Sequence, residues 1–239
     1  MPIETGTTVR ELVLVKPAAA RVFEGLGIDY CCGGSKPLIE ACNDAHVQLE
    51  EVIAALEKPE SALQGHDWRA APLSELIQHI VNQHHVFARD ESKRLMLLIS
   101  KVVAVHGKNH PELLRVQSLF RDLSQELTTH MAKEEKLLFP YIIEMEEAIS
   151  HRGSLPPAMF GTAVQNSVRT MEREHDSSGR ALHKMRTLTN GYIPPPDACV
   201  TYQTLYRALE DFERDLHEHV HLENNILFPR SVEAETAAF

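Results

Sequence analysis

The chain has 239 residues, 43% of them hydrophobic and 24% charged, which is the composition of a folded globular protein rather than a disordered or fibrous one. Its net charge of −10, without any basic block, argues against a nucleic acid partner. The sequence shows neither a signal peptide nor a run of the ~20 apolar residues that a membrane span needs, so we expect a soluble, cytoplasmic protein without a membrane partner.

The N-terminal segment predicts a small helical domain. Thr8 and Glu11 have the spacing of a capping box at the start of a first helix. Pro17 suits the first turn of a second helix, which should end at Gly25. A turn with two adjacent cysteines, IDYCCGGSKP, comes next. We expect two further helices, from about residue 37 and over residues 47–56.

The remainder of the chain predicts longer helices. Residues 58–64 contain Pro and Ser and precede a Gly, as linkers do, so we place the boundary near residues 60–67 and predict domains of residues 1–62 and 68–239. In the second domain, apolar residues recur with helical spacing between breaks rich in Gly and Pro. The expected helices cover about residues 72–105, 111–139, 159–188 and 199–228. This pattern predicts an all-α fold, a small helical domain followed by an up-down four-helix bundle.

An internal repeat relates the two halves of this bundle. The segment HMAKEEKLLFP, which starts at His130, matches HVHLENNILFP, which starts at His219, at five of eleven positions. The same spacing of 89 residues relates Glu134 to Glu223, and nearly the same spacing relates the pair His84–His85 to a histidine of the third helix. Each half is therefore predicted to be a helical hairpin, with a His on its first helix and a His-x3-Glu motif on its second.

The repeat predicts a metal site inside the bundle. A His and a Glu four residues apart lie on one face of a helix, so two facing hairpins bring four imidazoles and two carboxylates together. Burying these groups without an ion would be costly. This set of side chains resembles the inward-facing constellations of di-iron bundles, in which carboxylates can bridge two ions and histidines cap each one. We predict two non-haem iron ions with an oxo or hydroxo bridge and one open position for a small ligand.

Two choices of ligand stay open on spacing alone. His84 and His85 are neighbours, so only one of them can point inward, and the apolar periodicity does not choose between them. His217 and His221 are also four residues apart and compete with His219. The repeat favours His219 because only this histidine has a counterpart in the second helix.

Helix lengths place the candidate ligands along the bundle. At ~1.5 Å per residue, His85 and His130 both lie ~33 to 35 Å from the turn that joins their helices, so they return to one level. His106 lies at that turn, roughly 30 Å away, and we exclude it as a ligand. Glu126 and Asp215 each precede a candidate histidine by four residues. They are predicted to accept hydrogen bonds from ligand imidazoles, with surface ion pairing as the alternative.

With DYCCGG, HMAKEEKLLFP, EHD and HLENNILFPR in view, the chain resembles the family of iron-sulfur cluster repair di-iron proteins, which have a hemerythrin-like bundle. The likeness covers nearly the whole chain. By the pattern of that family, the ligand on the first helix is His85 rather than His84. The metal ligands that the resemblance implies are His85, His130, Glu134, His175, His219 and Glu223.

The adjacent thiols of Cys31 and Cys32 have two interpretations. Neighbouring cysteines are poorly placed for a mutual disulfide, and they suit thiol exchange or metal transfer if they are exposed near a helix N-terminus. The resemblance makes this dipeptide a hallmark of the N-terminal domain and implies a redox or iron-transfer role. The alternative is a turn with incidental small residues. Cys42 and Cys199 are predicted to be packing residues.

The resemblance implies a function in restoring iron-sulfur clusters damaged by nitric oxide or peroxide, by supplying iron from a labile site. The expected partners are damaged or apo iron-sulfur proteins and small ligands such as nitric oxide or dioxygen, and a homodimer stays open. One alternative is an enzyme that reduces nitric oxide at the two irons. Another is a module that reversibly binds or senses dioxygen or nitric oxide. The cysteines favour repair, because an oxygen carrier needs no thiols.

Overall fold

The structure is a computed structural model that describes residues 6–16, 19–31, 33–57, 67–151, 153, 156 and 164–238. Several predictions lie outside these residues. They concern Pro17, Cys32, the linker at residues 58–64 and the start of the third long helix at residue 159.

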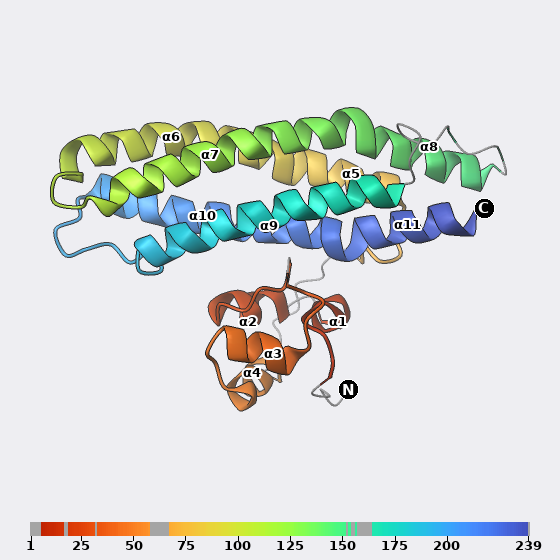
Figure 1. Cartoon of the computed structure of the whole chain (residues 1–239), viewed down its shortest axis with the longest axis horizontal. Coiled ribbons are helices and arrows are strands. Elements are labelled where there is room, and N and C mark those ends of the chain that lie inside the picture. The colour runs from red at the N-terminus through yellow and green to blue at the C-terminus, as the bar shows by residue number, and fades with distance from the viewer. Residues whose placement is uncertain are drawn as a thin grey trace.

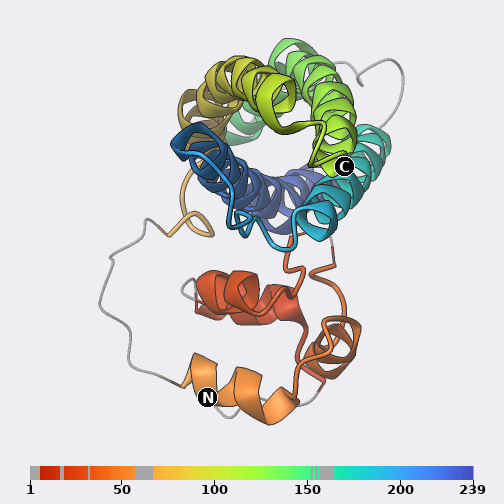
Figure 2. The ribbon, with the colours of Figure 1, turned by 90° about the vertical axis from the view of Figure 1, so that its left-hand side faces the viewer.

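Four long helical rods form the larger part of the molecule, so the predicted all-α bundle is confirmed (Figure 1). Seen end-on, the rods surround a common axis (Figure 2). The first rod contains α5 (Leu73–His79), η1 (Ile80–His85) and α6 (Val86–His106), and the second contains α7 (Glu112–Lys133), η2 (Glu134–Leu138) and α8 (Phe139–Ser150). The third is α9 (Val164–Leu188), and the fourth contains α10 (Val200–Leu222), η4 (Glu223–Leu227) and α11 (Phe228–Ala237).

Among the residues that the structure describes, three of the rods contain a π-helical turn, in η1, η2 and η4. Two of these turns have a cause in the repeated LFP sequence. Pro140 and Pro229 lack the backbone N–H, and the proline ring clashes with the carbonyl four residues earlier, which lies within the π turn in both cases. The helix continues beyond each proline to Ser150 and Ala237. The predicted ends at residues 139 and 228 were therefore too early.

Two apolar clusters fill the bundle on either side of a polar layer. One lies towards the turn between α6 and α7 and includes Phe120 and Phe212. The other lies among α5, α8 and α11 and includes Phe139 and Phe228. Buried Glu235 closes this second end, because its carboxylate accepts hydrogen bonds from the Tyr141 hydroxyl and a backbone N–H of α9. None of the described helices has the length and apolar character needed to cross a bilayer.

The described part of the small domain contains four short helices: α1 (Val9–Val15), α2 (Ala19–Gly25), α3 (Leu38–Asp44) and α4 (Leu49–Leu56). The capping box is confirmed, because Thr8 and Glu11 exchange both of its hydrogen bonds. Phe23 and Leu38 are fully buried in an apolar cluster of the domain's own. The domain lies beside the bundle on the side of α9 and α10 (Figure 2). It thereby approaches the second half of the repeat rather than the first.

Candidate metal centre

The structure brings all six predicted side chains together in the polar layer, and each is at most 3% exposed. They come from all four rods. His85 ends η1, His130 lies in the last turn of α7, Glu134 begins η2, His175 lies in the middle of α9, His219 lies in the last turn of α10 and Glu223 begins η4. Three of these positions lie in π turns, which occur often at functional sites because they change the face that side chains occupy.

The six residues form two groups that share both carboxylates. His85 and His219 belong to the first group, His130 and His175 belong to the second, and both groups include Glu134 and Glu223, with ligand atoms within 4.8 Å of one another. Each Glu therefore has oxygens within reach of both groups. This is the arrangement in which a carboxylate bridges two metal ions.

The distances between potential ligand atoms fit coordination. The Nε2 atoms of His85 and His219 are 3.2 Å apart, and those of His130 and His175 are 2.9 Å apart. Ligands on neighbouring corners around an ion, with bonds of about 2.1 Å, are separated by about 3 Å. Glu134 Oε1 lies 3.1 Å from the Nε2 atom of His130, at the same spacing. The donor set of imidazoles and carboxylates suits a first-row transition metal.

The electrostatics of the polar layer also favour a bound cation. Both carboxylate oxygens of Glu134 are buried and have no hydrogen-bond partner among the described residues. Burial raises the pKa of Glu134, and the charge of Glu223 raises it further. Burial opposes ionisation of Glu223 as well, but the neighbouring imidazoles of His219 and His175 hold its pKa well below the usual range. Metal ions would neutralise both carboxylates at once, so the residues of the polar layer fit a metal centre.

The imidazoles of the two groups differ in their tendency to take up protons. Burial and the charge of His219 lower the pKa of His85 to about 4. Burial also acts against protonation of His130, but Glu134 and other carboxylates outweigh it and raise the pKa to about 9. Because a metal ligand must be the neutral imidazole, a proton has to leave His130 when an ion binds.

Three of the four imidazoles are held through Nδ1. His85 donates to Glu135 at 2.7 Å, and Arg89 binds the same carboxylate. His130 donates to Glu174 at 2.9 Å. The third, His175 on α9, donates to the side-chain oxygen of an asparagine, Asn224, at 2.7 Å. Such bonds fix the tautomer that presents Nε2 to a metal.

The prediction that Glu126 and Asp215 hold the ligand imidazoles is wrong. Glu126 is exposed and contacts the Ser177 hydroxyl, whereas Asp215 accepts a hydrogen bond from His84. The observed acceptors come either from a facing rod or from the residue that follows a ligand glutamate. The latter signal is visible in the sequence as a polar residue in both copies of the repeat.

The fourth imidazole, that of His219, has no such partner. Its Nδ1 atom is buried without a hydrogen-bond partner among the described residues. The ring of His84 stacks against it, with centroids 5.7 Å apart, and the Nε2 atom of His84 is likewise buried without a partner. The two groups are therefore held unequally by the surrounding protein.

The other histidines that the structure describes lie outside the two groups. His84 is directed towards Asp215, so the structure brings His85 rather than His84 to the centre. His217 and His221 pack against the ring of Tyr30 in the small domain. The competing pair from the sequence therefore faces the neighbouring domain, and the repeat identified the inward residue.

The other end of the bundle holds the histidine that was excluded as a ligand. His106 ends α6, and its Nε2 atom lies 3.2 Å from the sulfur of Cys199. Cys42 is buried as predicted, but the prediction for Cys199 is wrong, because this residue is an exposed N-cap of α10. Cys199 lies at the end of a helix at the tip of the bundle, where fewer neighbouring residues can cover it.

The small domain touches the bundle immediately beside the metal centre. The Asn224 side chain donates to the carbonyl of Cys31 at 3.3 Å, and that of Asn225 donates to the carbonyl of Tyr30 at 3.0 Å. Arg10 donates to the Asn225 side-chain oxygen at 2.6 Å. The two asparagines follow a ligand glutamate directly, so the docking contact and the metal layer share one π turn.

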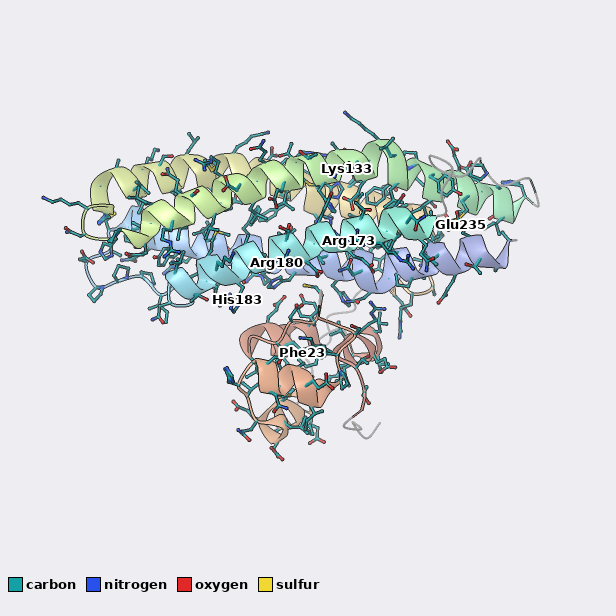
Figure 3. The ribbon with its side chains drawn as sticks, in the orientation of Figure 1. Phe23, Lys133, Arg173, Arg180, His183 and Glu235 are labelled. Atoms are coloured by element: carbon teal, nitrogen blue, oxygen red, sulfur yellow. The ribbon has the colours of Figure 1, made fainter. Side chains whose placement is uncertain are left out.

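The thiol of Cys31 does not meet the condition of exposure on which a role in thiol exchange or metal transfer depends. The residue is only 5% exposed, and its sulfur donates to Asp29 at 3.4 Å. Cys31 lines a cavity of about 630 Å³ between the small domain and helices α9 and α10. Arg180 and His183 of α9 line the same cavity, beside the small domain (Figure 3). The loop that contains Cys31, here called the cysteine loop, thus lines the cavity between the small domain and the bundle.

Comparison with known proteins gives consistent matches. The hemerythrin HHE cation binding domain family matches residues 76–231, and a domain of unknown function, DUF542, matches residues 5–60. Three similar proteins, from Pectobacterium atrosepticum, Pectobacterium carotovorum subsp. carotovorum and Escherichia coli, are each named iron-sulfur cluster repair protein YtfE. Each is 35% identical, over 94% of this chain and 96% of the relative.

Proposed function

Because the chain belongs to the family of iron-sulfur cluster repair proteins with a hemerythrin HHE cation binding domain, we propose that it repairs iron-sulfur clusters damaged by nitrosative or oxidative stress. It does so by donating iron from a labile centre of two iron ions. The observation that carries this proposal is the pair of buried His groups that share both glutamates.

Each side chain has a defined role in this proposal. His85 and His219 hold one ion, His130 and His175 hold the other, and the two glutamates lie between them. The bound iron supplies the ion that a damaged cluster has lost. The protein keeps the imidazoles in the correct tautomer through Nδ1 and keeps water out through the apolar clusters on both sides.

The unequal support of the imidazoles favours stepwise release. Loss of a hydrogen bond to a ligand imidazole typically costs roughly 10- to 100-fold in metal affinity. His219 lacks this bond, whereas His130 and His175 both have it. The ion held by His85 and His219 is therefore the one that we expect to leave first.

The cysteine loop is proposed to receive or relay the iron. Thiolates are softer ligands than imidazoles or carboxylates and bind iron well. The side chain of Asn224 hydrogen-bonds both the imidazole of His175 and the backbone carbonyl of Cys31, and so links the two residues. Cys32 belongs to the same proposal and lies outside the described residues. We further propose domain limits of residues 1–62 and 68–239, a cytoplasmic location, and damaged or apo iron-sulfur proteins as partners.

A reconstitution assay tests the proposed function. The iron-loaded full chain is mixed with a cluster enzyme that nitric oxide has inactivated, and recovery of that enzyme is followed while nitrous oxide is measured. We expect recovery in proportion to the iron supplied, and no recovery with the Glu134→Ala chain. Recovery that is the same without the loaded protein contradicts the proposal. Nitrous oxide formed with turnover would instead identify a nitric oxide reductase.

A further inference from the structure

The side-chain amide of Asn224 bridges the metal centre and the cysteine loop. Its oxygen accepts from the Nδ1 atom of His175 at 2.7 Å, and its nitrogen donates to the carbonyl of Cys31 at 3.3 Å. Asn224 is only 5% exposed. The amide is therefore the sole side chain among the described residues that hydrogen-bonds both a metal-ligand candidate and the loop.

The direction of this amide depends on the tautomer of His175. When Nε2 of His175 binds a metal, its proton must lie on Nδ1, so the oxygen of Asn224 has to face the imidazole. The amide nitrogen then necessarily faces the carbonyl of Cys31. Without a metal, the proton can move to Nε2, and the amide can turn to donate to Nδ1. Its oxygen would then oppose the carbonyl of Cys31, which is unfavourable.

We propose that Asn224 is a positioning residue that couples occupancy of the metal centre to docking of the Cys31 loop. The inference rests on the proposed function and deepens it. Binding free energies are coupled reciprocally. The loaded centre therefore favours the docked loop, and an undocked loop weakens retention of the ion that His175 holds. A client protein that draws the loop away would promote release of iron.

The equivalent position in the first hairpin supports this role. Glu135 precedes Asn224 by 89 residues and accepts from His85 in the same way. A carboxylate can only accept, and the same oxygen of Glu135 also accepts from Arg89. An amide, unlike a carboxylate, can accept from an imidazole through its oxygen and donate to a carbonyl through its nitrogen, and it occurs in the copy that faces the small domain.

Asn225 provides a matched control within the same π turn. Its side chain accepts from Arg10 and donates to the carbonyl of Tyr30. It also donates to Nδ1 of His221, which lies outside the metal groups. Asn225 therefore fastens the small domain without touching a metal-ligand candidate. Its loss should loosen the domain without removing the response to metal.

Hydrogen–deuterium exchange of the full chain tests the coupling. Peptides covering residues 28–36 are compared in iron-loaded and chelator-depleted protein, with iron content measured in the same samples. We expect exchange to be roughly 3- to 10-fold faster without metal, the effect of one lost hydrogen bond on local opening. Peptides from α3 should not change, because the hydrogen bonds of the amide go to His175 and Cys31 and not to α3.

Two variants separate coupling from general loosening. Asn224→Asp keeps the acceptor for His175 but cannot donate to Cys31, so it should retain iron and show fast loop exchange with or without it. Asn225→Ala should show faster exchange overall and keep the response to iron. Equal exchange in loaded and depleted wild type, or a preserved response in Asn224→Asp, overturns the inference. A chain that binds no iron overturns the proposed function as well, so the two failures are distinguishable.

Discussion

The two helical hairpins of the bundle place equivalent residues at the metal centre and then differ in what surrounds them. In both hairpins, the residue after the candidate ligand glutamate accepts a hydrogen bond from the histidine on the other rod of the same hairpin. Glu135 accepts from His85, and Asn224 accepts from His175. The two hairpins therefore share both the candidate ligands and one contact that orients them. A shared geometry of this kind follows from a common backbone with π turns at matching positions.

The hairpins differ at the residue that precedes His85 in one hairpin and His175 in the other. The second hairpin has Glu174 there, which accepts from His130 of the facing rod. The first hairpin has His84, which bonds to Asp215 and leaves His219 without an acceptor. The comparison teaches that both hairpins have the candidate ligands, whereas the surroundings of the two histidine pairs differ.

The largest effect should come from removing a carboxylate that both groups share. In Glu134→Gln, one oxygen ligand and one negative charge are lost from both groups, so we expect fewer than one iron ion per chain instead of two. Inductively coupled plasma mass spectrometry measures the content. Glu126→Gln is the matched control, because Glu126 is exposed and outside the groups, and it should keep two ions. Two ions retained in Glu134→Gln would contradict the claim that both groups share Glu134 as a ligand.

A pair of alanine variants tests the unequal surroundings. Glu174→Ala removes the acceptor of His130 and should lower metal affinity by roughly 10- to 100-fold. His84→Ala removes no hydrogen bond to a ligand, so its effect should be under about threefold. Competition with a coloured chelator gives both affinities. Equal losses in the two variants would show that the hairpins hold their ions alike.

The converse variant sharpens the same comparison. His84→Glu gives the first hairpin the residue that the second already has, with a carboxylate near the unpartnered Nδ1 of His219. We expect the faster phase of iron release to slow by up to about tenfold, because the histidine gains an acceptor. Stopped-flow release to a chelator follows both phases. An unchanged fast phase would mean that the missing hydrogen bond does not control the order of release.

The smallest effect concerns the contact between the hairpins at their far end. His110, in the turn between α6 and α7, binds both Glu112 and Asp197, and the bond with Asp197 raises the pKa of this imidazole. A raised pKa in the folded state means that the contribution to stability is present below about pH 6.5 and is lost as the pH rises through the folded value. His110→Gln should lower Tm at pH 5.5 and leave it unchanged at pH 8.5. A loss of equal size at both values would contradict a contribution from the charged imidazole.

Much of the centre could be predicted from the sequence because a repeat adds independent information to spacing. His-x3-Glu alone describes many exposed helix faces, but two copies 89 residues apart fixed His219 over His217 and His221. The resemblance to a known family was needed to choose His85 over His84. In the structure, that choice coincides with His84 turning towards a carboxylate on a neighbouring rod, which spacing along one helix does not encode.

The contacts around the ligands could not be predicted by extending α-helical spacing. Counting four residues back from His130 led to Glu126, which faces solvent. The π turns shift the register, so Glu134 and Glu135 both reach the imidazole layer although they are neighbours in the chain. The repeated LFP prolines were the available signal for that shift. The docking of the small domain on Asn224 depends on contacts between distant segments, which local patterns do not describe.

Anomalous X-ray diffraction at the iron absorption edge, on crystals of the iron-loaded full chain, tests the central claim most directly. The account predicts two anomalous peaks inside the bundle, one between the Nε2 atoms of His85 and His219 and one between those of His130 and His175, with both glutamates beside each. A loaded protein whose iron lies elsewhere, or a single peak bound by one histidine pair with the other pair hydrogen-bonded and empty, would contradict it.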